Sequence, residues 1–155
     1  MTMPKPLKLL TAKRKEFLEQ EAEYLTDDFF GEDELIRPEI LANDQGIKYS
    51  LNNYNNDFKG LIHYKGGKFH IYLDTTYGSN LNSKIIRYSF AHELGHYFID
   101  EQRVELIRMG VIPDEDENGM LSENIYEKEA EYFAACLLMP RKRILRDIAG
   151  EGFST

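Results

Sequence analysis

The sequence has a single cysteine, Cys136, in 155 residues. An intrachain disulfide is therefore impossible, and nothing in the sequence suggests an oxidising compartment. No apolar run approaches the roughly 20 residues that a membrane-spanning helix requires, and the first residues lead into no such run. We therefore expect a cytoplasmic protein that does not enter a membrane, in which Cys136 is a small buried apolar residue.

Positive charge is also scarce. The sequence has 19 Lys and Arg against 27 Asp and Glu, a net charge of −8. Its basic residues are scattered, except for short clusters at 13–15 and 141–143. Phosphate binding needs a basic surface, so this balance argues against direct binding of nucleic acid. It leaves a protein partner open.

Internal repeats, linkers and low-complexity tracts are absent as well. A chain of 155 residues with 42% hydrophobic residues can bury one core, but it is too short for two ordinary domains. We expect a single domain over residues 1–155.

Apolar periodicity and Pro or Gly stops predict a series of helices. They span residues 11–30, 37–43, 83–99 with a continuation to 109, 123–139 with Ser122 as its cap, and 141–149. Alternating patterns predict three strands, of which the last two form a hairpin. They span residues 47–51, 58–64 and 68–73. The acidic segment 110–119 is predicted to be a loop. The fold class is α+β, with a small three-stranded antiparallel sheet packed on the helices 83–99 and 123–139.

The segment Ala91-His92-Glu93-Leu94-Gly95-His96-Tyr97 lies within the helix predicted over 83–99. Each residue turns a helix by about 100°, so His92 and His96 stand one turn apart on one face and can reach the same ion. Glu93 lies beside them, where the general base of a hydrolytic zinc enzyme contacts the metal-bound water. A satisfied structural cluster is the alternative. The apolar residues around the motif favour the metal site, because an unpaired polar cluster deep in the fold would be costly.

A catalytic zinc ion needs three protein ligands and an open position for water. The extended motif, with Gly three residues and a third ligand six residues after the second His, is absent because those positions hold Ile99 and Gln102. The third ligand should therefore come from a downstream helix. His63 and His70 are candidates too, but isolated strand histidines are more often surface residues or cross-strand partners.

The downstream helix 123–139 carries several glutamates. Glu127 and Glu131 are four residues apart on one face, so we expect Glu127 to point inward and Glu131 to bond a ligating histidine. Glu129 points about 180° from the midpoint of that pair, which predicts a solvated side chain. An exposed acidic stripe is the alternative for this face.

Two stretches together resemble the ImmA/IrrE family of zinc metallopeptidases: residues 87–97, with His-Glu-x-x-His, and residues 127–140, which begin Glu-Lys-Glu-Ala-Glu and end Met-Pro. By this resemblance the metal ligands are His92, His96 and Glu127, and Glu93 is the catalytic carboxylate. The chain departs from the family pattern at Glu131, where the family more often has Asn or Asp.

The resemblance implies one zinc ion per chain and a zinc-dependent endopeptidase acting on a regulatory protein, such as a DNA-binding transcriptional repressor. The alternative is a regulator that captures the repressor without cutting it. A structural zinc site would want a fourth ligand, and Cys136 lies about 180° around its helix from Glu127. Tyr88, one turn before His92, is a candidate oxyanion partner or a rim tyrosine.

The strand 68–73 leads into the loop before the His-Glu-x-x-His helix. We expect this strand to lie at an edge of the sheet and to align an extended substrate beside the metal, because edge pairing fixes a backbone whatever its side chains are.

Overall fold

The computed structural model describes residues 9–112 and 125–151. The described chain forms six helices and three strands, and it confirms the α+β class. The elements are α1 (Ala12–Phe29), α2 (Pro38–Asp44), β1 (Lys48–Asn52), β2 (Gly60–Lys65), β3 (Lys68–Asp74), α3 (Lys84–Phe98), α4 (Asp100–Met109), α5 (Ile125–Leu138) and α6 (Arg141–Glu151). Most of the predicted loop 110–119 and the predicted cap Ser122 lie outside the described residues.

The three strands form one mixed sheet in the order β1-β3-β2. Strands β2 and β3 are the predicted hairpin, joined by Gly66 and Gly67 with φ of 59° and 79°. Two consecutive residues with positive φ match the twist of a two-residue hairpin turn, and glycine adopts that conformation without steric cost. The prediction of a wholly antiparallel sheet is wrong for β1, which runs parallel to β3.

The strand order also corrects the expected edge position of residues 68–73. Strand β3 is the central strand, hydrogen-bonded to β1 on one side and to β2 on the other. Both of its backbone edges are therefore occupied along the sheet. The outer strands are β1 and β2, and a substrate strand cannot pair with β3 without displacing one of them.

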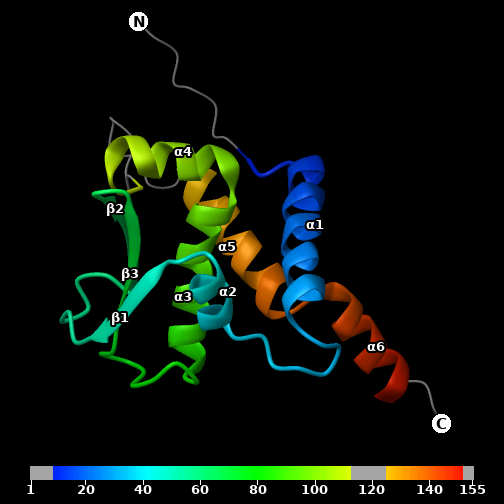
Figure 1. Ribbon diagram of the computed structural model, residues 1–155. Coiled ribbons are helices and arrows are strands. Elements are labelled where there is room, and N and C mark those ends of the chain that lie inside the picture. The colour runs from blue at the N-terminus through cyan, green and yellow to red at the C-terminus, as the bar shows by residue number, and fades with distance from the viewer. Residues whose placement is uncertain (1–8, 113–124, 152–155) are drawn as a thin grey trace, which may run out of the picture.

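Helix α3 lies at the centre of the molecule, with the sheet on one side and α5 on the other (Figure 1). The inward side chains Ile62, Ile71 and Leu73 of the sheet are buried and belong to the same core as Phe90 and Leu94 of α3. Helix α1 covers the side of α5 that is turned away from α3 (Figure 1). Two of the helices, α3 and α5, are therefore covered by protein on more than one side.

Helices α3 and α5 approach each other closely at Gly95. A Cβ atom at this position would lie 3.2 Å from the Cα of Ala130 and 3.3 Å from its Cβ. Small residues at the crossing let two backbones come near each other, so side chains on both helices can meet across the contact. This crossing places the start of α5 beside the histidines of α3.

The predicted helical continuation after residue 99 is present, but as a separate helix. Ile99 has an extended backbone with ψ of 112°, which ends α3 and starts α4 in a new direction. Gly110, with φ of 86°, ends α4 in the left-handed conformation that favours glycine. Because the chain turns at Ile99, the first turn of α4 folds back against the end of α3.

Among the described residues, no helix combines the length and apolar character that crossing a membrane requires.

Candidate metal centre

The two histidines of the α3 motif converge on the carboxylate of Glu127. The Nε2 atom of His92 lies 2.8 Å from Glu127 Oε2, and the Nε2 atom of His96 lies 3.0 Å from Glu127 Oε1. Their ligand atoms all lie within 4.8 Å of one another. The structure thus brings together the three residues that the sequence analysis predicted as ligands. The four-residue spacing aligns the two histidines on α3, and the α3–α5 crossing brings Glu127 to them.

The charges around this cluster favour a cation. Burial alone would raise the pKa of the Glu127 carboxyl, but hydrogen bonds with His92 and His96 outweigh it and hold the pKa well below its ordinary value. Burial alone would lower the pKa of His96, but its hydrogen bond to Glu127 and the charge of Glu93 raise it to about 9. The histidines stabilise the charged form of Glu127, and the carboxylates of Glu127 and Glu93 stabilise the protonated form of His96, so positive charge is favoured beside these carboxylates.

Glu93 is buried on α3, with 7% of its surface exposed. Burial raises the pKa of its carboxyl, although His96, His92 and the backbone N–H of Ile62 act to lower it. A Cβ atom at Gly60 would lie 3.0 Å from Glu93 Cγ, so the absence of a side chain at Gly60 makes room for this carboxyl. A buried carboxyl with a raised pKa, next to candidate metal ligands, has the properties of a general base.

A small pocket of about 70 Å³ joins these groups. Its lining includes Glu93, His96 and Glu127 from the helices, together with β2 at residues 60–62 and Ile112. The carboxyl of Glu93 and two of the candidate ligands, His96 and Glu127, therefore face one common space at the start of β2.

The donor set fits a catalytic zinc ion. Two imidazole nitrogens and one carboxylate oxygen are the ligands of one common class of hydrolytic zinc site. Within the described part of the chain, the group of candidate ligands comprises His92, His96 and Glu127. Three protein ligands leave one coordination position for water, as catalysis requires. Cys136 is not in this group, and it is half-buried rather than fully buried as expected.

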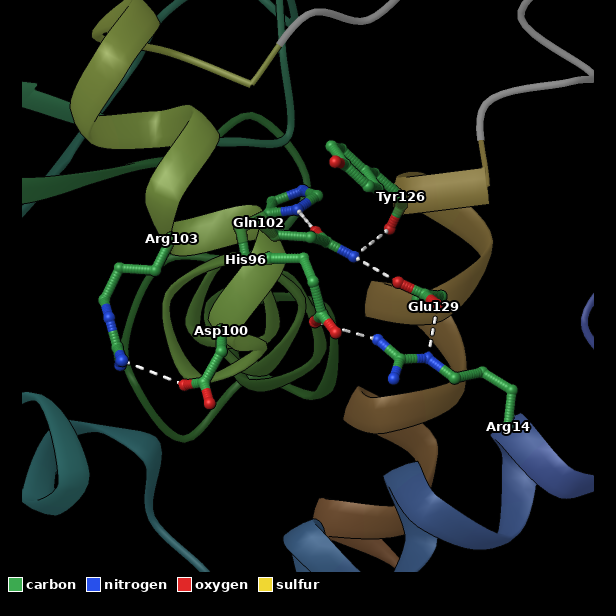
Figure 2. A network of polar contacts seen from close by, with 8 residues as sticks. Arg14, His96, Asp100, Gln102, Arg103, Tyr126 and Glu129 are labelled. Atoms are coloured by element: carbon green, nitrogen blue, oxygen red, sulfur yellow. Dashed lines mark hydrogen bonds and ion pairs between the residues drawn. The ribbon is translucent and has the colours of Figure 1, made fainter.

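The predicted roles of Glu129 and Glu131 are both wrong. Glu131 is exposed on α5 and makes no hydrogen bond to a histidine within the described residues. Glu129, predicted to be solvated, has only 6% of its surface exposed. Its carboxylate accepts hydrogen bonds from Gln102 and Arg14, and Gln102 in turn contacts His96 (Figure 2).

Gln102 and Arg14 are two buried-network residues near the site that sequence reasoning missed. Gln102 occupies the position at which the extended zinc motif would carry its third ligand, so the motif itself marked the position without indicating its role. Arg14 lies near the start of α1, far away in sequence, and no spacing rule connects it to the motif.

The strand histidines lie outside the cluster of candidate ligands. His63 and His70 are opposite each other in the β2–β3 register, as predicted for cross-strand partners. His70 Nε2 lies 2.7 Å from Ser50 Oγ, and its ring stacks on Tyr72 at 4.3 Å. Tyr88 is 41% exposed, with its ring centroid 6.4 Å from that of His92, so it lies at the rim of the site.

Comparison with known proteins supports the assignment of a metallopeptidase site to these residues. Residues 76–151, just under half of the chain, match the family model of the IrrE N-terminal-like domain, Peptidase_M78. The matched segment runs from the loop before α3 into α6 and contains His92, Glu93, His96 and Glu127. A search of curated proteins found no significant match to the chain.

Proposed function

We propose that the protein is a zinc-dependent endopeptidase that cleaves a protein substrate, because the match over residues 76–151 places it in the ImmA/IrrE metallopeptidase family. His92, His96 and Glu127 would hold one zinc ion, and Glu93 would be the general base. The observation that carries this proposal is the convergence of the two Nε2 atoms and the Glu127 carboxylate beside the buried carboxyl of Glu93.

A bound zinc ion would lower the pKa of its water and polarise the scissile carbonyl. Glu93 would take the proton from that water and pass it to the leaving amine, as a carboxylate with a raised pKa does well. The N–H of Ile62 and the narrow space at Gly60 hold the Glu93 carboxyl in place. Burial of these groups excludes competing water and strengthens their electrostatic interactions.

The substrate would lie along β2 rather than β3. The N–H of Tyr64 points away from β3, since it donates to Gly110 O at 2.7 Å. Residues 60 and 62 have the same parity, so their backbone groups also point outward, toward the pocket. The N–H of Ile62 is already engaged by Glu93 and His63 forms a bridge with Val111, so a peptide would pair with this edge toward its start, at Gly60. An extended peptide passing residues 60–62 would present its backbone to the proposed zinc ion, and strand pairing is a common way to align such peptides.

We infer that the substrate is an unfolded or flexible segment of a regulatory protein. The net charge of −8 disfavours nucleic acid as a ligand. A DNA-binding repressor is the first candidate, by the resemblance of the two motifs to a family whose members often inactivate repressors. A repressor encoded beside this gene would be the first protein to test.

The test compares wild-type protein with Glu93→Gln and with the control Glu131→Gln, which makes the same change at an exposed carboxylate. The measurements are zinc content and the rate of cleavage of reduced casein and of the neighbouring repressor. We expect one zinc ion per chain in all three proteins. Cleavage by Glu93→Gln should fall by about 10²- to 10⁴-fold, the usual contribution of a general base, and cleavage by the control should not change.

Wild-type cleavage by Glu93→Gln would overturn the proposal. If the wild-type protein and both variants bind the repressor and none of the three cleaves it, the protein is the non-cleaving regulator instead.

A further inference from the structure

We propose that Gln102 is a positioning residue for the metal centre, held in that role by Glu129 and Arg14. It fixes the ring of His96 so that Nδ1 carries the proton and Nε2 faces the metal. The inference rests on the proposed zinc site, but it concerns residues to which the two sequence motifs assign no role.

The orientation of the Gln102 amide follows from its partners. Its side chain is fully buried, and its Nε2 donates to the carbonyl oxygen of Tyr126 at 3.1 Å and to Glu129 Oε1 at 3.0 Å (Figure 2). A carbonyl and a carboxylate accept hydrogen bonds and cannot donate them, so the NH₂ group must face these two atoms.

The orientation of His96 follows in turn. With the NH₂ group engaged, the Oε1 atom of Gln102 is the one that faces His96, 2.6 Å from its Nδ1. An amide oxygen only accepts, so Nδ1 of His96 must donate. A metal would take the place of the proton that Nε2 shares with Glu127 Oε1, 3.0 Å away, while Nδ1 keeps its own proton, and the ring cannot rotate without breaking the bond to Gln102.

Arg14 completes the network from another helix. Its Nε donates to Glu129 Oε2 at 2.6 Å, and the side chain of Glu129 is only 8% exposed. A buried carboxylate needs a cation or several donors, and Glu129 has both Arg14 and Gln102. Arg14 also donates to Glu101 Oε2 at 3.1 Å, on the outer side of the network. The chain Arg14–Glu129–Gln102–His96 thus links α1, α5, α4 and α3.

The position of Gln102 favours a role toward the metal over one in packing alone. An apolar side chain of similar size would fill the same buried space without needing three hydrogen bonds. A buried amide with every partner in place restricts its neighbours to one arrangement. The neighbour restricted here is the more buried of the two candidate histidine ligands.

The main test measures zinc and cobalt affinity of the full chain by competition with a chromophoric chelator. Gln102→Met keeps a similar shape but lacks the amide oxygen that accepts the hydrogen bond from His96 Nδ1–H. We expect its metal affinity to fall by about 10- to 100-fold, the usual effect of removing a partner of a metal ligand.

The exchange variant Gln102→Glu with Glu129→Gln tests the polarity of the network. The carboxylate introduced at position 102 would accept from His96, and the amide introduced at position 129 would donate to that carboxylate and accept from Arg14. The net charge is unchanged. We expect the double variant to recover part of the metal affinity that Gln102→Met loses. Recovery should be incomplete because the hydrogen bond to the carbonyl oxygen of Tyr126 is lost. A purely structural role would not require any such recovery.

Arg14→Met and Arg103→Met form a matched pair. Arg103 is also an arginine near the end of α3, but its ion pair with Asp100 at 2.9 Å is not connected to Glu129 (Figure 2). We expect Arg14→Met to weaken metal binding severalfold, and Arg103→Met to leave it unchanged.

A spectroscopic measurement on the wild type keeps the proposal testable even if Gln102→Met does not fold. In the cobalt-loaded protein, the Nδ1 proton of each ligating histidine gives a paramagnetically shifted signal. We expect the His96 signal to persist in D₂O and the His92 signal to exchange faster. Rapid exchange of the His96 signal, or wild-type affinity in folded Gln102→Met, would overturn the inference. Failure of the wild type to bind zinc or cobalt at all would instead reject the proposed function.

Discussion

The two histidines of the candidate site have very different surroundings. The side chain of His96 is 3% exposed, and its second nitrogen is bonded within the buried network of Gln102, Glu129 and Arg14. The side chain of His92 is 13% exposed and lies next to the exposed Tyr88. Within the described residues, no hydrogen bond is seen at the second nitrogen of His92.

This difference separates two tasks of the site. The His96 side lies in the interior, where hydrogen bonds and packing fix the geometry in advance. The His92 side lies at the rim, beside the exposed Tyr88. Helix α5 shows the same division within little more than one turn, since Glu129 points into the network, Glu127 faces the histidines and Glu131 faces solvent.

The largest expected effect is at the residue that joins the two sides. Glu127→Ala should retain no zinc after dialysis, because three ligands leave little redundancy. Its control is Glu131→Ala, which should keep one zinc ion per chain. Metal analysis of both proteins gives the answer. Full zinc occupancy in Glu127→Ala would overturn the assignment of Glu127 as the third ligand.

The next effect contrasts the buried and exposed carboxylates of α5 directly. Glu129→Ala leaves Arg14 and the amide of Gln102 without their shared partner, and we expect a loss of about 2–4 kcal/mol in the free energy of unfolding. Glu131→Ala should change it by less than about 0.5 kcal/mol. Urea unfolding of the metal-free proteins measures both values. Equal values for the two variants would show that the network does not stabilise the fold.

A smaller effect is expected where α3 and α5 cross. Gly95→Ala places a methyl group 3.2 Å from the Cα of Ala130, and such overpacking costs about 1–3 kcal/mol. Separation of the helices should also weaken zinc binding, because Glu127 is carried by α5 and both histidines by α3. Gly150→Ala is the control, since a Cβ there meets no atom within 4 Å. An unchanged melting temperature in Gly95→Ala would mean that the crossing adjusts freely.

The smallest effect is expected at the rim. Tyr88→Phe removes a hydroxyl from a residue that is 41% exposed, so its free energy of unfolding should change by less than about 0.5 kcal/mol. Zinc affinity should also stay within about twofold of the wild type, since only partners of ligands alter it strongly. Chelator competition and urea unfolding test this. A large loss of zinc would place Tyr88 within the metal site and would remove the contrast between the two sides.

Much of the site was predictable because it depends on helix periodicity. The four-residue spacing of His92 and His96 places them on one face in any α-helix. The small residues of the downstream helix allow a close approach, and the resemblance to a known family selected Glu127 among its glutamates. The helices and strands themselves follow local patterns of apolar residues, with Pro and Gly at their ends, so their predicted bounds lie close to those of the structure.

The strand order was not predictable in this way. Alternation shows which residues of a strand share a face, but it does not show which strand lies beside which. Local hairpin chemistry correctly predicted the pairing of β2 with β3. The loop 53–59 carries the chain past β3, so that β1 pairs with β3 in parallel. As a result β3 is central, and the strand at the edge beside the pocket is β2 instead of the predicted β3.

The sequence by itself determined the ligand spacing, the fold class and the motif that carries Glu93. Only the tertiary structure decided which glutamate of α5 is buried, because periodicity describes one helix and not the neighbours around it. Helices α1 and α4 cover the side of α5 that pattern reasoning assigned to solvent, and so Glu129 is enclosed while Glu131 is not. In the same way, the turn at Ile99 brings Gln102 against His96, a contact that no spacing of residues along one helix can specify.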